Sequence, residues 1–197
     1  MVIPITIKGV IHVGAHWGQE YQYYVNRGVE NMIFFEPVKS NFEMLKMKLP
    51  EDENIKLFNI ALGNETGTRE MFIETANSGQ SCSILEPDKH LIQYPEIAFK
   101  SKELVEIDKL DNIKFNRSLY NLLNIDTQGF ELEVLKGAKE TLKFINCIYM
   151  EVNRDSLYKG CPMVEEIDEY LKGFNRIYTA WIGKTWGDAT YLRYDRQ

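Results

Sequence analysis

The chain has 197 residues, of which 44% are hydrophobic and 12% aromatic, enough to bury one good core. This length favours a single domain that spans residues 1–197. The net charge is −6 and the Lys and Arg residues are scattered, which argues against a nucleic-acid groove because neutralising phosphates requires clustered cations.

The cysteines and the first residues predict the cellular compartment. The chain has an odd number of cysteines, Cys82, Cys147 and Cys161, which are far apart and form no C-x-x-C motif. We therefore expect reduced thiols and no zinc knuckle. Residues 1–8 have no cationic leader, and no apolar run has the length of a membrane span. We therefore expect a cytoplasmic protein without a membrane span.

A glycine turn dominates the first part of the chain. Residues 10–13 form an apolar strand that enters a turn between Gly14 and Gly18, and residues from Gln19 onward look helical. We expect the backbone to approach a ligand here, so a side chain at Gly14 would displace the ligand and one at Gly18 would spoil the turn. The spacing is G-x-x-x-G, which differs from the G-x-G-x-x-G of dinucleotide-binding proteins.

The remaining elements alternate between strands and helices. Ser40 and Glu43 form a predicted capping box, and Pro50 ends the helix that the box opens. Residues 75–83 read as a loop, and residues 86–102 as irregular with some helix. The predicted strands are 31–35, 55–60, 68–74, 104–107, 120–125, 147–150, 176–181 and 190–193. The predicted helices are 20–26, 40–49, 129–136, 139–144 and 163–172. This order predicts an α/β fold whose mostly parallel sheet has an antiparallel edge hairpin.

Four of these strands lead into a residue suited to binding or catalysis, namely Gly14, Glu36, Asp126 and Glu151. Ligands of such sheets bind at the carboxyl ends of the strands, so we expect all four in one crevice. Glu36 follows the glycine turn by about twenty residues, the spacing of an acid that binds ribose hydroxyls. The alternative is a solvated acid before the turn at Pro37.

The other acids allow several roles. Asp126 is suited to orient an amino group, accept a substrate proton or hold a cation, and it can also cap the next helix. Glu151 is either a second acid in the crevice or a loop cap. Glu131 and Glu133 suit the helix dipole, and Glu131 is also a weak site candidate.

The histidines and the missing motifs narrow the reaction class. We expect His12 to be a packed core residue, whereas His16 either contacts the ligand or supports the glycine turn. His90 has no assigned role. No Ser-His-Asp order and no G-x-x-x-x-G-K-[ST] is present, which argues against a hydrolase triad and a P-loop kinase.

Residues 123–138, Leu-Asn-Ile-Asp-Thr-Gln-Gly-Phe-Glu-Leu-Glu-Val-Leu-Lys-Gly-Ala, are the longest recognisable motif. Shorter motifs are Val-Gly-Ala-His-Trp-Gly at 13–18, Phe-Glu-Pro at 35–37, Asn-Ile-Ala-Leu-Gly at 59–63 and Ser-Gly-Gln-Ser-Cys-Ser at 78–83. Together they resemble the FkbM family of S-adenosylmethionine-dependent methyltransferases over residues 11–153.

The resemblance implies a Rossmann-like class I methyltransferase sandwich that methylates a hydroxyl of a sugar, a glycan or a small natural product. The implied catalytic residues are Asp126, His16 and Glu151. The implied S-adenosylmethionine-binding residues are Gly14, Ala15, His16, Gly18, Glu36, Pro37, Ala61, Ser78 and Asp126. A divalent metal held by Asp126 and Glu151 is a variant without support from ligand spacing. We expect no nucleic-acid partner, and the sequence does not predict an oligomeric state.

The motifs also depart from the family. His12 stands where many members have an acid that holds the amino-acid end of the cofactor, a contact that we expect from Asp126 or the Ser78 loop instead. His16 replaces a common Asn, and Gln128 replaces a Glu. These losses motivate an alternative, a non-catalytic glycan-binding or assembly module.

A third hypothesis, a nucleotide-sugar or nicotinamide enzyme, is disfavoured by the missing G-x-G-x-x-G. The acceptor itself has no readable code in the sequence. Trp17, Tyr94 and Trp186 are candidates to stack on a sugar ring, with ordinary packing as the alternative.

Overall fold

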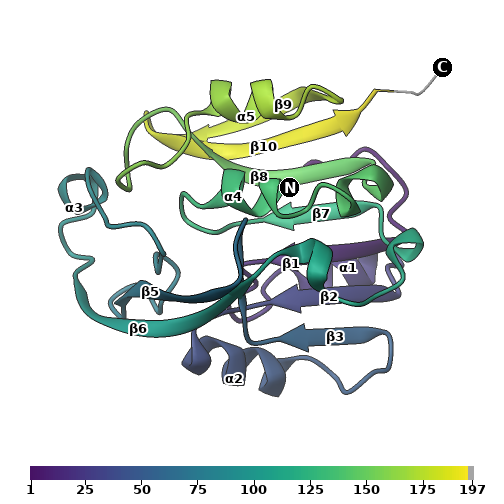
Figure 1. Cartoon of the computed structure of the whole chain (residues 1–197), viewed down its shortest axis with the longest axis horizontal. Helices are drawn as coiled ribbons and strands as arrows, with labels where there is room; N and C mark the ends of the chain where they lie inside the picture. Colours follow the sequence, from purple (N-terminus) through teal and green to yellow (C-terminus); the bar gives the residue numbers. More distant parts are fainter. Residues whose placement is uncertain (195–197) are drawn as a thin grey trace.

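A seven-stranded sheet with helices packed against it forms the body of the protein (Figure 1). The structure is a computed structural model and describes residues 1–194. The strands of this sheet are β1 (Gly9–Val13), β2 (Asn31–Phe35), β3 (Ile55–Phe58), β7 (Leu122–Ile125), β8 (Cys147–Asn153), β9 (Phe174–Ile182) and β10 (Trp186–Arg193). Their order is β3-β2-β1-β7-β8-β10-β9. The predicted α/β fold is confirmed.

Strand β1 lies at the point where the chain changes direction across the sheet. From β1 the chain proceeds outward through β2 and β3, and it later returns to β7 on the other side of β1. All of these pairs are parallel, whereas β10 is antiparallel to both β8 and β9 and forms the predicted edge hairpin. Such a reversal opens a crevice at the carboxyl ends of the strands.

The chain contains five short α-helices within residues 1–194. They are α1 (Tyr21–Asn26), α2 (Lys39–Lys48), α3 (His90–Gln93), α4 (Glu131–Lys136) and α5 (Val164–Tyr170). The predicted helix at 139–144 is a 3-10 turn, Thr141–Phe144. Within residues 1–194, no helix has both the length and the apolar character needed to cross a bilayer.

The sheet is buried on both faces, which explains its continuous apolar strands. Along β1, Val10 belongs to the core on one face, together with Met32 and Leu122. Its neighbour Ile11 belongs to the core on the other face, together with Ile33. Because side chains alternate along a strand, two separate cores hold the central strands in place.

A second, smaller sheet lies beside the first and was predicted only in part by the sequence analysis (Figure 1). It consists of β4 (Ala61–Leu62), β6 (Phe99–Asp108) and β5 (Gly67–Glu74), in that order. The prediction covered only 104–107 of β6, because the first half of that strand is exposed and carries lysines and a glutamate. The buried side chains of Val105 and Ile107 belong to the same core cluster as Val38, which joins this sheet to the start of α2.

Helix α2 begins differently from the prediction. Val38 is its N-cap residue, and the predicted Ser40–Glu43 capping box does not form. The Val38 N–H instead donates a 2.9 Å hydrogen bond to Oε1 of Glu36. The N-cap therefore lies two residues earlier than predicted, because the carboxylate of Glu36, directly after β2, replaces the cap.

Gly14 is required for a reason that the sequence analysis did not anticipate. Its φ is +79°, and a Cβ atom at this position would lie 1.7 Å from the carbonyl oxygen of Asp126. The amide of Asp126 in turn donates to the carbonyl of Val13 at 2.9 Å. The space that a side chain would need belongs to the backbone after β7, so the glycine permits the close approach of β1 and β7.

Replacing Gly14 by alanine should therefore destabilise the protein strongly. Gly28 is the matched control, because its φ is +70° but a Cβ atom there meets nothing within 4 Å. We expect Gly28→Ala to cost about 1 kcal/mol from its backbone conformation alone, and Gly14→Ala at least about 2 kcal/mol more. Urea unfolding measures both, and equal losses would contradict the proposed clash.

Candidate functional site

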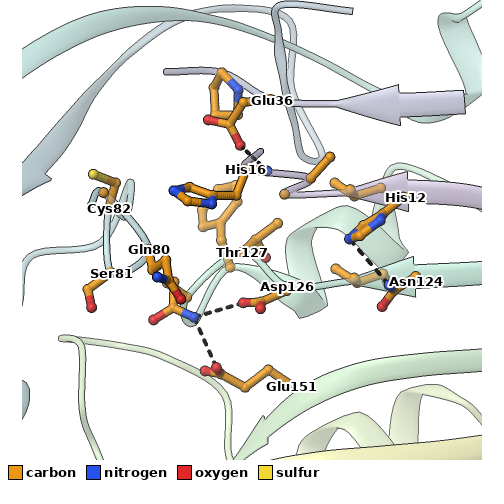
Figure 2. Close-up of a pocket in the computed structure, with 18 of the residues that line it drawn as sticks. His12, His16, Glu36, Gln80, Ser81, Cys82, Asn124, Asp126, Thr127 and Glu151 are labelled. Carbon is orange, nitrogen blue, oxygen red and sulfur yellow. Dashed lines mark hydrogen bonds between the residues drawn. The ribbon is translucent and has the colours of Figure 1, made fainter. Parts of the chain in front are cut away.

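A cavity of about 700 Å³ opens at the carboxyl ends of β1, β2, β7 and β8 (Figure 2). This volume lies within the range of small-molecule and cofactor sites. Eight of the predicted site residues line the cavity: Gly14, Ala15, His16, Glu36, Pro37, Ala61, Asp126 and Glu151. The predicted convergence of the four strands on one crevice is therefore present in the structure.

Two predicted residues, Gly18 and Ser78, are not among the lining residues. Gly18 has a φ of +74°, and a Cβ atom there would lie 2.7 Å from Leu49 and 2.8 Å from Leu45. Ser78 offers its backbone carbonyl to His16. Both residues therefore support the residues that line the cavity but do not line it themselves.

Glu36 links the glycine turn to the start of α2. Its Oε2 accepts the N–H of His16 at 2.8 Å, and its Oε1 accepts the N–H of Val38 at 2.9 Å. The residue is only 4% exposed. Burial raises the pKa of Glu36 to about 7, although both backbone hydrogen bonds oppose the shift.

His16 supports the turn through both ring nitrogens. Nε2 lies 2.7 Å from the carbonyl of Ser78, which can only accept, so Nε2 carries the proton. Nδ1 then accepts from the side-chain amide of Gln19, also at 2.7 Å. In this arrangement neither nitrogen is available for a substrate proton.

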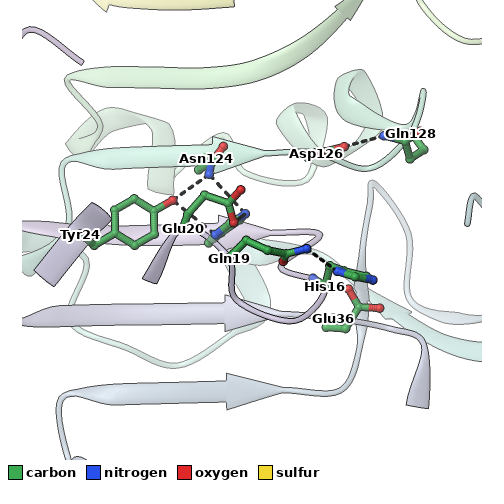
Figure 3. Close-up of polar contacts among 9 residues, drawn as sticks. His16, Gln19, Glu20, Tyr24, Glu36, Asn124, Asp126 and Gln128 are labelled. Carbon is green, nitrogen blue, oxygen red and sulfur yellow. Dashed lines mark hydrogen bonds and ion pairs between the residues drawn. The ribbon is translucent and has the colours of Figure 1, made fainter. Parts of the chain in front are cut away.

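Gln128 joins the two predicted catalytic acids, and Figure 3 shows its contact with Asp126. Its Nε2 donates to Oδ1 of Asp126 at 2.7 Å and to Oε2 of Glu151 at 3.0 Å. The hydroxyl of Tyr158 donates to Oε1 of the same amide at 3.0 Å. An amide at position 128 therefore bridges two carboxylates that a glutamate would repel.

The surroundings of Asp126 and Glu151 favour their protonated forms. Burial within the protein is the main cause of the raised pKa of each group, and repulsion from neighbouring carboxylates adds to it. Glu151 is 4% exposed, whereas Asp126 is exposed and lines the cavity. Asp126 is thus the carboxylate that a ligand can reach.

Glu131 holds the turn that carries Gln128. Its Oε1 accepts from the N–H of Thr127 at 2.9 Å, from the hydroxyl of Thr127 at 3.0 Å and from the N–H of Gly129 at 3.1 Å. The residue is 1% exposed. Its contacts indicate a positioning role rather than a complement to the helix dipole.

His12 is buried, as expected of a packed core residue, and Figure 2 shows its contact with Asn124. It is 2% exposed, with Nδ1 3.3 Å from the hydroxyl of Tyr24 and Nε2 3.2 Å from the amide nitrogen of Asn124. The Asn124 amide also donates to the Tyr24 hydroxyl at 2.7 Å. Burial lowers the pKa of His12, so its imidazole is neutral near pH 7.

Three further lining residues, Glu20, Tyr149 and Asp188, were missed. Asp188 falls between the predicted strands 176–181 and 190–193, yet it lies in β10 directly opposite Glu151 of β8. Strand β8 extends to Asn153 and not to 150 as predicted. Two ionised acids in opposite positions would destabilise a sheet, and the pKa values of both Glu151 and Asp188 are raised, mainly by burial. Residues 186–193 form one continuous strand, so extending the predicted strand back through Gly187 would have included Asp188.

The charge of the cavity is mainly negative. Carboxylates line it and no Lys or Arg does among residues 1–194, although Met1, whose terminal ammonium favours the ionised form of Asp188, also lines it. In the same residues, no group of three His, Cys, Asp or Glu side chains is arranged to hold a metal ion. The donor set therefore gives no support to the metal variant, and the wall suits a ligand with positive charge.

Two aromatic side chains from outside the β1–β2–β7 region also line the cavity. Tyr94 and Trp186 both line it, and the indole N–H of Trp186 donates to the hydroxyl of Tyr94 at 2.9 Å. His90 also lines the cavity and is 3% exposed, with no partner for Nδ1 in the described part of the chain. Trp17 instead stacks on His16, with ring centroids 4.7 Å apart.

Comparison with known proteins identifies the family. The methyltransferase FkbM domain model matches residues 12–178. The chain belongs to the FkbM methyltransferase family. It is therefore a methyltransferase, as the motif at 123–138 indicated.

A curated relative agrees with this assignment, and two solved structures share the fold. The chain is 24% identical to 2-O-methyltransferase NoeI of Sinorhizobium fredii over 176 residues, 85% of this chain and 72% of the relative. A putative S-adenosylmethionine-dependent methyltransferase from Listeria monocytogenes has a TM-score of 0.55 at 8% identity, covering 99% and 95% of the two chains.

M. capricolum TrmK, solved with S-adenosylhomocysteine, has a TM-score of 0.50 at 9% identity and covers 94% of this chain and 62% of its own. At these identities the two solved structures show the fold alone, which is that of Rossmann-like methyltransferases.

The turn at 127–129 provides a test of the site's construction. Glu131→Ala leaves two backbone N–H groups without an acceptor, so we expect a loss of about 2 kcal/mol or more in the free energy of unfolding. Glu133→Ala, on the same helix, removes only a partly exposed ion pair with Lys136 and should cost about 0.5 kcal/mol. Similar losses in chemical denaturation would refute the positioning role of Glu131.

Proposed function

We propose that this methyltransferase uses S-adenosylmethionine to methylate a hydroxyl oxygen of a sugar, a glycan or a small natural product. The observation that carries the proposal is the convergence of the Gly14 turn, Glu36 and Asp126 on one cavity in a chain of the FkbM family. The family and the neighbour solved with S-adenosylhomocysteine support this cofactor. The printed name of NoeI, a 2-O-methyltransferase, supports oxygen as the acceptor atom.

The residues present fit this cofactor. Glu36 projects from the end of β2 into the cavity, where an acid can accept hydrogen bonds from both ribose hydroxyls. Pro37 and Ala61 add apolar surface beside it, and the Gly14–Ala15 backbone forms the floor between β2 and β7. When bound, the cofactor supplies a methyl group on a positively charged sulfur, which the acidic wall of the cavity suits.

The protein's own part of the reaction is positioning and proton removal. Holding the acceptor oxygen in line with the methyl carbon supplies much of the rate. Asp126 is the best base, because it is open to the cavity and its raised pKa lies closer to neutral pH than that of an ordinary aspartate. Glu151 lies behind the Gln128 bridge, and the ring nitrogens of His16 are both occupied.

The acceptor side of the cavity supports a ring-shaped, uncharged acceptor. Tyr94 and Trp186 offer aromatic faces and a fixed hydroxyl on which a sugar can pack. The lining carries no Lys or Arg in the described residues, so a phosphate or carboxylate on the acceptor would lack a counter-charge. Incubation with methyl-labelled cofactor and a pool of neutral glycosides, followed by mass spectrometry, tests the function; absence of labelled product together with absence of cofactor binding would reject it.

Replacing the proposed base should separate chemistry from binding. Asp126→Asn keeps an oxygen for the Gln128 amide but removes the basic carboxylate. We expect turnover to fall by about a hundred- to ten-thousand-fold, with the dissociation constant for S-adenosylhomocysteine changing much less. Unchanged turnover in a labelled-methyl assay would show that Asp126 is not the base, and Glu133→Gln serves as the control substitution.

Cofactor binding should also depend on pH through Glu36. Because its pKa is raised to about 7, the carboxyl is mostly protonated near pH 6 and ionised near pH 8. An ionised acceptor binds hydroxyl donors about twice as strongly as a neutral one, so affinity for S-adenosylhomocysteine should rise across this window, by up to about tenfold per pH unit below the pKa.

Calorimetry at several pH values measures this dependence. Glu36→Gln should have weak affinity and a flat profile across the window, whereas Glu133→Gln should keep the slope. A slope that survives in Glu36→Gln would assign the titration to another group.

A further inference from the structure

Glu20 stands out among the acids of the cavity because its carboxylate has neither a hydrogen bond nor a Lys or Arg partner within residues 1–194. It precedes α1, lines the cavity and has a side chain that is 36% exposed. Its carboxylate makes no hydrogen bond within residues 1–194, and its one ion-pair neighbour is Nε2 of His12 at 4.0 Å. Since the imidazole of His12 is neutral near pH 7, Glu20 has no charge partner there.

The other carboxylates in this part of the cavity are already engaged. Asp126 and Glu151 share the amide of Gln128. Asp188 lies against the hydroxyl of Tyr149. A free carboxylate directed into a ligand cavity is the group best placed to receive a cation that arrives with the ligand.

The topology places Glu20 at one end of the cofactor's path. Glu36 marks the end of β2, and a ligand held there by its ribose must cross the Gly14 turn to reach β7. Figure 3 shows Glu20 beyond that turn, beside Tyr24 and Asn124 and away from Glu36. The amino-acid end of S-adenosylmethionine, which carries a primary ammonium, lies on the opposite side of the sulfur from the ribose.

We propose that Glu20 binds the α-ammonium group of the cofactor, in the place of an acid at position 12 and instead of Asp126 or the Ser78 loop. This inference depends on the proposed use of S-adenosylmethionine. It assigns the carboxylate contact of the amino-acid end to the start of α1, while His12 closes the cluster with Tyr24 and Asn124 beneath it. Asp126 then keeps its proposed role as the base for the acceptor hydroxyl.

The test compares two ligands that differ in this end alone. S-adenosylhomocysteine carries the ammonium, whereas 5′-methylthioadenosine keeps the adenosine and the thioether but has no amino-acid end. By calorimetry, Glu20→Gln should weaken S-adenosylhomocysteine about tenfold, the loss of one charged hydrogen bond. The same variant should change the affinity for 5′-methylthioadenosine less than twofold.

Two control variants make the outcome decisive. Glu30→Gln removes an exposed carboxylate outside the cavity lining and should leave both affinities unchanged. Asp188→Asn tests the competing carboxylate and should leave the preference for S-adenosylhomocysteine intact. Equal weakening of both ligands by Glu20→Gln, or no weakening of either, would overturn the inference, and failure of the wild-type protein to bind either ligand would reject the proposed function as well.

Discussion

The close approach of β1 and β7 is the constraint on which the site depends. The carbonyl of Asp126 occupies the space where Gly14 would carry a side chain, and the amide of Asp126 bonds to the carbonyl of Val13. This contact brings the glycine turn and the carboxylate after β7 together at the point where the strand order reverses. The cavity is a consequence of that packing, with β2 and β8 supplying Glu36 and Glu151 on either side.

Around this contact, acidic side chains serve two purposes. Glu36 and Glu131 use their oxygens to hold backbone N–H groups, and so fix the turns at residues 14–18 and 127–129. Asp126 and Glu20 face the cavity with fewer protein partners. The first pair therefore builds the wall, and the second pair gives the wall its negative charge. Gln128 moderates this charge by bridging Asp126 to Glu151.

Much of this arrangement was predictable from the sequence because buried parallel strands have a strong apolar signature. The runs at 31–35 and 120–125, each followed by an acid or a turn, placed Glu36 and Asp126 correctly at one edge of the sheet. The strand β6 was only partly predicted, because an exposed strand rich in Lys and Glu has no apolar run. Asp188 was missed since the adjacent glycine suggested a turn.

Other features depend on tertiary contacts that no local pattern records. The capping box at Ser40 failed because Glu36 reaches the N–H of Val38 from the preceding strand. The sequence analysis expected a side chain at Gly14 to displace a ligand, whereas the group that such a side chain would meet first is the carbonyl of Asp126, distant in the sequence. The free state of the Glu20 carboxylate likewise depends on the neutral imidazole of His12 and appears only in the folded chain.

The most direct test of the central claim is a crystal structure of the protein with S-adenosylhomocysteine. We expect the ribose hydroxyls at the carboxylate of Glu36, the chain of the ligand across the Gly14–Ala15 backbone, and the amino-acid end on the β7 side of that turn. A ligand bound outside this cavity, or one whose ribose lies away from Glu36, would contradict the account.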